Sequence, residues 1–320
     1  MRLIAKKISA DWPLGVMRGH VHSSHTGVLN IELGATGLHS VMDERQLGEQ
    51  ARVAYVQIPL GLRFSDLVPS GHTVFLNSVS LMFERSSLSL DFSSAKVMNF
   101  FPENQLKEYT PSRACVASWL AAWKFLMKYD GPKGFMPGTT RQTFGMFNDA
   151  INTRFWTKLP LLLCNIRLGR LKESVITASS FRGLGMGCTP SGDDFLTGLI
   201  VGAGFSTSAP RNQEFIRKFG RELVKGPWVE NKLVGKFRLD AIAGHPSLVL
   251  CKLCSLLSEG VTGLPLERAI REALACGSTS GWDTLLGLLS GFSVSCQAMF
   301  TEIEKYSTLY AAQGELKRAC

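Results

Sequence analysis

The sequence predicts an α+β protein, with a β-rich N-terminal part packed on a mostly helical C-terminal part. Roughly the first 95 residues consist of short apolar runs separated by turn residues, and this pattern is typical of strands. From Thr143 onward, apolar residues recur at helical spacing. Pro102 and Pro111 frame a polar segment between these regions, so we expect a domain boundary there. The expected domains are 1–105, rich in strands, and 106–320, mainly helical.

Local patterns predict the individual elements. Val28–Leu33, Val53–Ile58 and Val74–Leu76 are rich in β-branched residues, have glycines nearby and are expected to be strands. Apolar spacing predicts helices over 112–128, 166–179, 192–206, 212–225, 248–258 and 266–276, and a last long helix from about 280 toward 300.

Composition narrows the function classes. The net charge is +9, but the Lys and Arg residues are scattered and form no basic stripe, so we do not expect nucleic-acid binding. No apolar run is long enough for a membrane span, and the N-terminus lacks the apolar core of a signal peptide. The eight Cys residues, Cys251 and Cys254 included, are expected to be reduced core thiols in a cytoplasmic protein.

Three histidines lie close together near the N-terminus. On a strand, His20 and His22 would share a face, which is the geometry of a paired metal ligand, and His25 follows them. No carboxylate or Cys nearby completes a ligand set. Histidines that face solvent or bond to the backbone are the commoner case, so both interpretations stay open.

A glycine-rich segment followed by a helix start is the most informative stretch of the chain. Alternating glycines lead into Thr189, Pro190 and Ser191, then into Asp193 and Asp194 and an apolar run. Ser191 is expected to be the N-cap, and Asp194 to complete a capping-box pair. Glycine backbones and a helix N-terminus together form an anion site. The expected anion-binding residues of this stretch are Gly185, Gly187, Thr189, Ser191, Asp193 and Asp194.

The same pattern occurs a second time. Ser191–Gly202 aligns with Ser280–Gly291, and seven of the twelve positions are identical, among them Asp194 and Asp283. We expect two helices that start alike, with N-termini facing one shared site to which Thr279, Ser280 and Asp283 also belong. Glycines four residues apart share a helix face and predict close packing of the helices, at Gly198 and Gly202 and at Gly287 and Gly291.

The three aspartates complicate a pure anion site, because ionised carboxylates repel phosphate. Mg²⁺ held by Asp193 and Asp194 would bridge them to a phosphate group. Alternatively, an aspartate would accept hydrogen bonds from the NH₂ of a carbamoyl or amide group. A third interpretation is that Asp193, Asp194 and Asp283 only cap helices. No arrangement typical of nucleophilic catalysis is present, so the sequence assigns no catalytic residue.

Both motifs resemble the AllH-like family. The resemblance is carried by G-x-G-x-G-x-T-P-S-G-D-D-x-L-x-G and, downstream, by G-S-T-S-G-W-D-T-L-L-G; Gly15–Val41 resembles the family's opening more loosely. The family includes a subunit of the oxamate carbamoyltransferase of anaerobic allantoin breakdown, a branch of purine catabolism. Asn231–Leu239 departs from the family by lacking its Thr and Ser residues, which leaves open whether the acid is oxamate or a relative.

The resemblance implies a subunit that acts in carbamoyl transfer between a carbamoyl phosphate-like donor and oxamate or a related small acid. Other protein subunits and a small anionic substrate are then its expected partners, and activity is expected in the complex. The alternative is a non-catalytic ligand-binding or structural subunit of a multi-subunit enzyme. Lys133, in a loop rich in glycine and proline, would contact an anion or simply lie in a surface turn.

Overall fold

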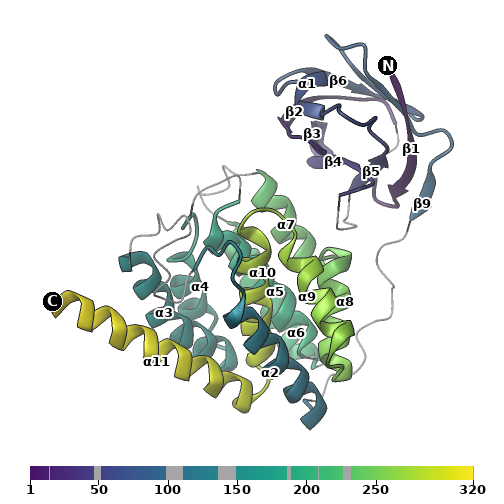
Figure 1. Cartoon of the computed structure of the whole chain (residues 1–320). Coiled ribbons are helices and arrows are strands. Elements are labelled where there is room, and N and C mark those ends of the chain that lie inside the picture. The colour runs from purple at the N-terminus through teal and green to yellow at the C-terminus, as the bar shows by residue number, and fades with distance from the viewer. Residues whose placement is uncertain are drawn as a thin grey trace. The chain divides into compact units, whose positions relative to one another are not determined.

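The computed structural model describes residues 1–13, 15–46, 52–98, 111–135, 149–185, 189–207, 209–225 and 232–319. The chain divides into two compact units, Met1–Glu103 and Asn104–Cys320. Strands dominate the first unit and helices form the second, so the predicted α+β class is confirmed (Figure 1). None of the described helices is both long and apolar enough to cross a membrane.

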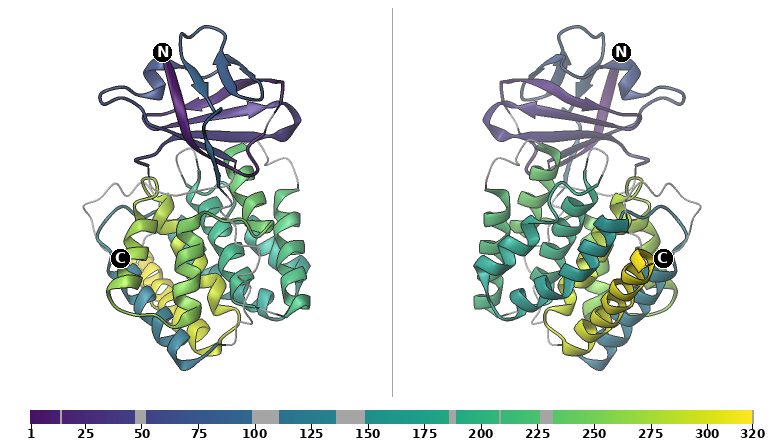
Figure 2. Two further views of the ribbon diagram at one scale, coloured as in Figure 1. Left: turned by 90° about the vertical axis from the view of Figure 1, so that its right-hand side faces the viewer. Right: turned by 90° about the vertical axis from the view of Figure 1, so that its left-hand side faces the viewer.

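In the described residues of the first unit, the strands form one sheet that closes into an eight-stranded barrel (Figure 2). Neighbouring strands of the barrel are antiparallel, except that β1 (Arg2–Ser9) is parallel to β8 (Ser89–Asp91) and β4 (Leu38–Asp43) is parallel to β5 (Val53–Val56); outside the barrel, β9 (Lys96–Met98) is also parallel to β1. This further strand pairs with the second half of β1, beyond β8. Around the barrel the order is β1 (Arg2–Ser9), β5 (Val53–Val56), β4 (Leu38–Asp43), β3 (Val28–Leu33), β2 (Met17–Ser24), β6 (Thr73–Leu76), β7 (Ser80–Phe83) and β8 (Ser89–Asp91).

Buried and exposed side chains alternate in β1, β6 and β7, whereas every residue of β4 and β5 is buried. In β1, Leu3 and Ala5 are buried while Ile4 and Lys6 are exposed, because successive residues of a strand point to opposite faces. The predicted strands are confirmed as β3, β5 and β6, although β5 ends two residues earlier than expected, at Val56. A short 3₁₀ turn (Gly34–Thr36) and the short helix α1 (Phe64–Leu67) also belong to this unit.

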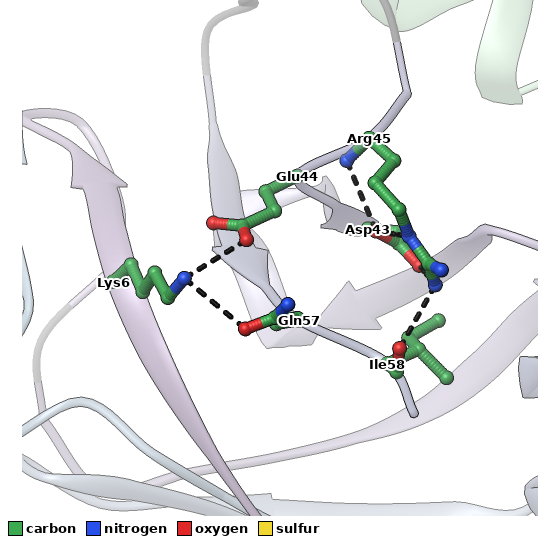
Figure 3. A network of polar contacts seen from close by, with 6 residues as sticks. All are labelled: Lys6, Asp43, Glu44, Arg45, Gln57 and Ile58. Carbon is green, nitrogen blue, oxygen red and sulfur yellow. Dashed lines mark hydrogen bonds and ion pairs between the residues drawn. The ribbon is translucent and has the colours of Figure 1, made fainter. Parts of the chain in front are cut away.

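Polar contacts join β1, the end of β4 and the chain after β5 (Figure 3). Lys6 Nζ donates to Glu44 Oε1 at 2.9 Å and to Gln57 Oε1 at 3.2 Å. The Arg45 guanidinium binds the buried Asp43 carboxylate, and this hydrogen bond holds the pKa of Asp43 below its ordinary value. The exposed Lys6–Glu44 pair contributes only about 0–1 kcal/mol. The Asp43–Arg45 pair, in which the carboxylate is buried and the guanidinium is half exposed, is the more important of the two for ordering this turn.

The second unit is a bundle of helices around one apolar core. Two central helices, α5 (Ser191–Phe205) and α10 (Ser280–Ser293), lie side by side and are buried over most of their length (Figure 1). Trp119 Nε1 donates to Leu289 O at 2.9 Å and so anchors α2 to α10. The described helices are α2 (Arg113–Lys128), α3 (Asp149–Arg167), α4 (Leu171–Ser179), α5 (Ser191–Phe205), α6 (Pro210–Val224), α7 (Lys232–Ile242), α8 (Leu248–Glu259), α9 (Leu264–Leu274), α10 (Ser280–Ser293) and α11 (Gln297–Ala319).

The backbones of α5 and α10 touch through their glycines, as the sequence predicts. A β-carbon on Gly198 would overlap the carbonyl oxygen of Thr284, and one on Gly287 would overlap that of Phe195. Gly202 meets the Leu288 carbonyl and Gly291 meets the Leu199 carbonyl in the same way. Each contact joins equivalent positions of the sequence repeat, so the two helices run parallel and are related by an approximate two-fold axis. Their N-termini therefore lie together.

Two predicted helices are each split in the structure, most of α3 precedes the segment that was predicted as a helix, and α7 was not predicted at all. The segment 166–179 contains the end of α3 and all of α4, because Gly169 has a positive φ of 67° and ends α3. The expected long helix toward 300 ends at Ser293, and α11 begins at Gln297 after three residues. The unpredicted helix is α7, whose charged residues are buried and so carry no clear amphipathic pattern.

The glycine contacts predict a sharp difference between two alanine substitutions in α5. Gly198→Ala forces a methyl group against the Thr284 carbonyl, so we expect it to lower the free energy of unfolding by at least about 2 kcal/mol. Gly204→Ala is the matched control, because no atom lies within 4 Å of the added carbon. It should be neutral or stabilising by up to about 1 kcal/mol. Urea unfolding compares them, and equal effects would contradict the proposed contact.

Candidate functional site

The start of α5 differs from its prediction. Pro190, not Ser191, is the N-cap, and its carbonyl accepts the N–H groups of Asp193 at 2.9 Å and Asp194 at 3.1 Å. Ser191 is already the first helical residue and makes no cap hydrogen bond, so the predicted N-cap and capping box are wrong. The physical reason is that the Pro190 carbonyl accepts the first helical hydrogen bonds, so the helix starts one residue earlier than predicted. The Ser191 hydroxyl then lies where α5 contacts α10.

One half of the paired helix starts is centred on Asp194. Thr189 Oγ1 donates to Asp194 Oδ2 at 3.0 Å and lies 2.9 Å from Ser280 Oγ of α10. Burial raises the pKa of Asp194 to about 7, although hydrogen bonds from Ser280 and Thr189 oppose the rise. The nearby charges are Asp193, which adds to the rise, and Arg238, which opposes it.

The other half is centred on Asp283, which is fully buried. The Phe135 N–H donates to Asp283 Oδ1 at 3.1 Å. Burial raises the pKa of Asp283 to about 8, against the effect of the neighbouring Ser191 and Thr279 hydroxyls and the Phe135 N–H, while Asp194 adds to the rise. Within the described residues, neither Ser191 Oγ nor Asp283 Oδ2 has a hydrogen-bond partner of good geometry.

Each half of the site combines a serine of one helix with an aspartate of the other. Ser280 of α10 lies beside Asp194 of α5, and Ser191 of α5 lies beside Asp283 of α10. This arrangement follows from the approximate two-fold axis between the parallel helices. The structure thus brings together six of the residues that the sequence suggested: Thr189, Ser191, Asp194, Thr279, Ser280 and Asp283.

Asp193 points to a different partner. Its Oδ1 accepts from Arg238 Nη2 at 2.5 Å, and its Oδ2 accepts from the Gly183 N–H at 2.9 Å. Both side chains are buried, with 3% of Arg238 and 9% of Asp193 exposed. Arg182 lies close enough that burial and the Arg238 charge lower its pKa. The sequence did not indicate Arg238, because this ion pair joins α5 to the unpredicted α7.

More of the free backbone donors lie on α10 than on α5. In α5 the N–H groups of Gly192, Asp193 and Asp194 already donate to carbonyl oxygens. In α10 the N–H groups of Ser280, Gly281 and Trp282 have no partner among the described residues.

The glycine loop before α5 is only partly described. Gly183 and Gly185 adopt positive φ angles of 67° and 114°, which glycine tolerates, and the Gly183 N–H is occupied by Asp193. Gly187 lies outside the described residues.

No described group of three or more His, Cys, Asp or Glu side chains is arranged to hold a metal ion. His20 lies on β2, 3.3 Å from Glu32. Magnesium at Asp193 and Asp194 stays a prediction, and the two oxygens of Asp193 are already engaged. Cys251 and Cys254 are free buried thiols, as expected, and burial raises the pKa of both.

The buried aspartates predict that the protein is more stable in mild acid than in base. Each folded pKa lies above the ordinary value of 3.8, so the folded state binds more protons than the unfolded state between about pH 4 and 8. The free energy of unfolding therefore falls as pH rises through this window. Asp283→Asn removes the contribution of Asp283 to this pH dependence. The free energy of unfolding of the variant minus that of wild type should therefore increase by at least about 1.4 kcal/mol from about pH 5.5 to 8.5.

Urea unfolding at the two pH values measures this difference. Glu259→Gln, which changes an exposed carboxylate on α8, is the control and should shift the stability equally at both. A pH-independent difference between Asp283→Asn and wild type would show that Asp283 does not titrate in this range.

The Asp193–Arg238 pair predicts a non-additive mutant cycle. Asp193→Ala leaves a buried guanidinium without its carboxylate and should destabilise the fold by about 3–5 kcal/mol. Adding Arg238→Met removes the stranded charge, so the double variant should recover most of this loss. Chemical denaturation of the two single variants and the double variant measures the coupling, and additive losses would contradict a direct pair.

Residues 181–292 match the family model described as oxamate carbamoyltransferase subunit AllH. No curated protein and no solved structure matches the chain. The matched segment contains both helix starts, their glycine contacts and the Asp193–Arg238 pair. The predicted resemblance is thereby confirmed: over residues 181–292, this chain is similar to the AllH family of oxamate carbamoyltransferase subunits.

Proposed function

We propose that this chain is a subunit of a carbamoyltransferase that transfers a carbamoyl group from a carbamoyl phosphate-like donor to oxamate or a related small acid. The starts of α5 and α10 would bind the ligands. The observation that carries the proposal is that the segment matched by the family model holds the two paired helix starts, with their hydroxyls and buried acids.

The electrostatics of the paired starts suit an anion. Each helix N-terminus carries about half a positive charge, and the parallel arrangement places two of them together. The unpartnered N–H groups of Ser280, Gly281 and Trp282 supply donors of the kind that bind phosphate and carboxylate groups. Burial raises the pKa of Asp194 to about 7 and that of Asp283 to about 8, so these side chains are largely neutral below those values and repel an anion less.

Lys133 belongs to the segment that packs against Ser191 and Asp283. It directly precedes Gly134, whose backbone lies against Ser191 and Asp283. Burial lowers the pKa of Lys133, and among the described residues it has no ion-pair partner; Asp130 is the acidic residue near enough to oppose the shift. A half-buried ammonium group of this kind gains most from an anionic ligand.

The proposed chemistry needs little covalent help from the protein. The acceptor nitrogen attacks the carbamoyl carbon, a C–N bond forms, and the C–O bond to phosphate breaks as phosphate leaves with its electron pair. The nitrogen loses one proton, and the departing phosphate takes it up. Negative charge develops on the carbamoyl oxygen during the attack. Preorganised N–H donors at that oxygen would stabilise this charge, which is the role proposed for the start of α10.

A non-catalytic subunit is the second candidate. The observation in its favour is that the Asp193 carboxylate and the N–H groups of Gly192, Asp193 and Asp194 in α5 are engaged in internal bonds. Such a subunit would bind the ligand or brace its partners, and the partners would turn over substrate without it.

The proposal predicts that carbamoyl phosphate and oxamate bind the isolated chain and that Ser280→Ala weakens the binding. The lost hydroxyl contacts Thr189 and Asp194, and a hydrogen bond to a charged ligand contributes about 1.5–3 kcal/mol, so a decrease of about tenfold or more is expected. Isothermal titration calorimetry on the full chain measures the affinity.

Ser206→Ala is the matched control, because Ser206 lies at the opposite end of the same helix pair and bonds to Ala203 and Gly291 carbonyls. It should leave the affinity unchanged. Absence of binding by both compounds, or equal effects of the two substitutions, would overturn the proposed site.

A further inference from the structure

Arg182 lies in a turn that is fixed against the first turn of α5. The turn follows α4, and the buried Phe181 ring anchors it in the core of the helical unit. The Gly192 N–H of α5 donates to Leu184 O at 2.8 Å. A β-carbon on Gly192 would overlap the Phe181 carbonyl oxygen, so the two backbones touch. The backbone of Arg182 is therefore held at the start of α5.

Two guanidinium groups meet one carboxylate at this position. Arg238 Nη2 donates to Asp193 Oδ1 at 2.5 Å, and the Gly183 N–H donates to Asp193 Oδ2 at 2.9 Å, so both oxygens of Asp193 are occupied. Burial and the Arg238 charge lower the pKa of Arg182, and the Asp193 charge opposes them. Because Arg238 takes Asp193 as its ion-pair partner, the charge of Arg182 has no carboxylate of its own among the described residues.

Arg182 also keeps hydrogen-bond donors that solvent can reach. Its hydrogen bond within the described residues, from Nη1 to Lys225 O, is 3.4 Å long and lies outside the ordinary range for an N–H donor. A guanidinium carries several further N–H groups in one plane. Arg182 is partly exposed and Gly183 is exposed, so a ligand can approach this turn from solvent.

Capping of a helix end accounts for Arg238 better than for Arg182. Both arginines lie at the C-terminal end of α6, which favours cations, and Arg238 Nη1 donates to Leu223 O at 3.3 Å. Arg238 is 3% exposed and has a carboxylate partner as well. Arg182 has lost part of its hydration and gains one long bond in return. A partly buried cation with so little internal compensation points to an anionic ligand.

We propose that Arg182 binds the phosphate group of the ligand. The planar guanidinium fork can donate parallel N–H bonds to two oxygens of one oxyanion. Phosphate is favoured over a carboxylate because it carries more negative charge, and the Coulomb attraction to Arg182 grows with that charge. Gly183 and Gly185 adopt positive φ angles and have no side chains, so a phosphate can approach the backbone of the loop closely.

This inference rests on the proposed function and assigns the two ends of the donor to different elements. The first turn of α5 connects these elements, because Asp193 contacts the Gly183 backbone while the next residue, Asp194, contacts Ser280 of α10. The phosphate of a carbamoyl phosphate-like donor would lie at Arg182. Its carbamoyl group would point toward the N–H groups that begin α10.

Inorganic phosphate is the probe for this contact, because it lacks the carbamoyl group. Isothermal titration calorimetry on the full chain at neutral pH should find that Arg182→Gln weakens phosphate binding by about tenfold or more, since hydrogen bonds to a charged ligand are lost. Arg217→Gln is the matched control, because Arg217 is exposed on α6 and the substitution removes the same charge. It should leave the affinity within about twofold of wild type, since exposed charges at a distance are screened. Equal effects of the two substitutions overturn the inference.

Modification by phenylglyoxal tests the same contact on the wild-type chain, because this reagent reacts with accessible arginines. With phosphate at about ten times its dissociation constant, mass spectrometry should show roughly tenfold slower modification of Arg182 and an unchanged rate at Arg217. This measurement replaces the calorimetry if Arg182→Gln fails to fold. Unprotected Arg182, or equal protection of both arginines, contradicts the proposed contact.

The outcomes separate this inference from the proposed function. If Arg182→Gln leaves phosphate affinity unchanged, or weakens oxamate and not phosphate, while Ser280→Ala weakens oxamate, the phosphate contact is wrong and the proposed function stands. If phosphate binds through Arg182 but oxamate does not bind and Ser280→Ala leaves carbamoyl phosphate affinity unchanged, the proposed function fails and the phosphate contact stands. If phosphate does not bind the wild-type chain, this inference is overturned.

Discussion

Four glycines let the backbones of α5 and α10 touch, and the candidate site depends on that contact. Parallel helix dipoles side by side repel one another, so this orientation needs compensation. The compensation comes from close backbone packing and from the buried apolar side chains that surround both helices. The result is that two positive helix ends lie together, with a serine and an aspartate from each helix placed across from those of the other.

Burial, and not the helix ends, decides the charge of the central aspartates. A helix N-terminus favours an ionised carboxylate by about 0.3–1 kcal/mol, or up to about 2 in buried geometry. Desolvation nevertheless raises the pKa of Asp194 to about 7 and that of Asp283 to about 8, and each unit corresponds to about 1.4 kcal/mol. Desolvation therefore outweighs the dipole at both positions. Asp193 has Arg238 as a direct partner, and the pairing balances its charge.

The sequence predicted the α+β class and the two matching helix starts because these follow from local pattern and repetition. It also predicted the close helix contact, since glycines at spacing four have few other uses in a buried helix. The N-cap at Ser191 was wrong because the Pro190 carbonyl begins the helix one residue earlier. Arg238 and Phe135 were missed because each meets its aspartate through a contact between distant segments, which no spacing rule reveals.

The sequence repeat determines the shape of the candidate site, and segments outside the repeat determine which hydrogen bonds its two aspartates make. Asp194 and Asp283 occupy equivalent positions, yet a Thr189 hydroxyl satisfies the first, while Gly134 and Phe135 cover the second. Two-fold symmetry alone would give two identical half-sites. Segments outside the repeat break it, so one acid is bonded internally and the other keeps an unused oxygen. The two halves of the candidate site therefore differ, as the proposed binding of one small asymmetric molecule in a single orientation would require.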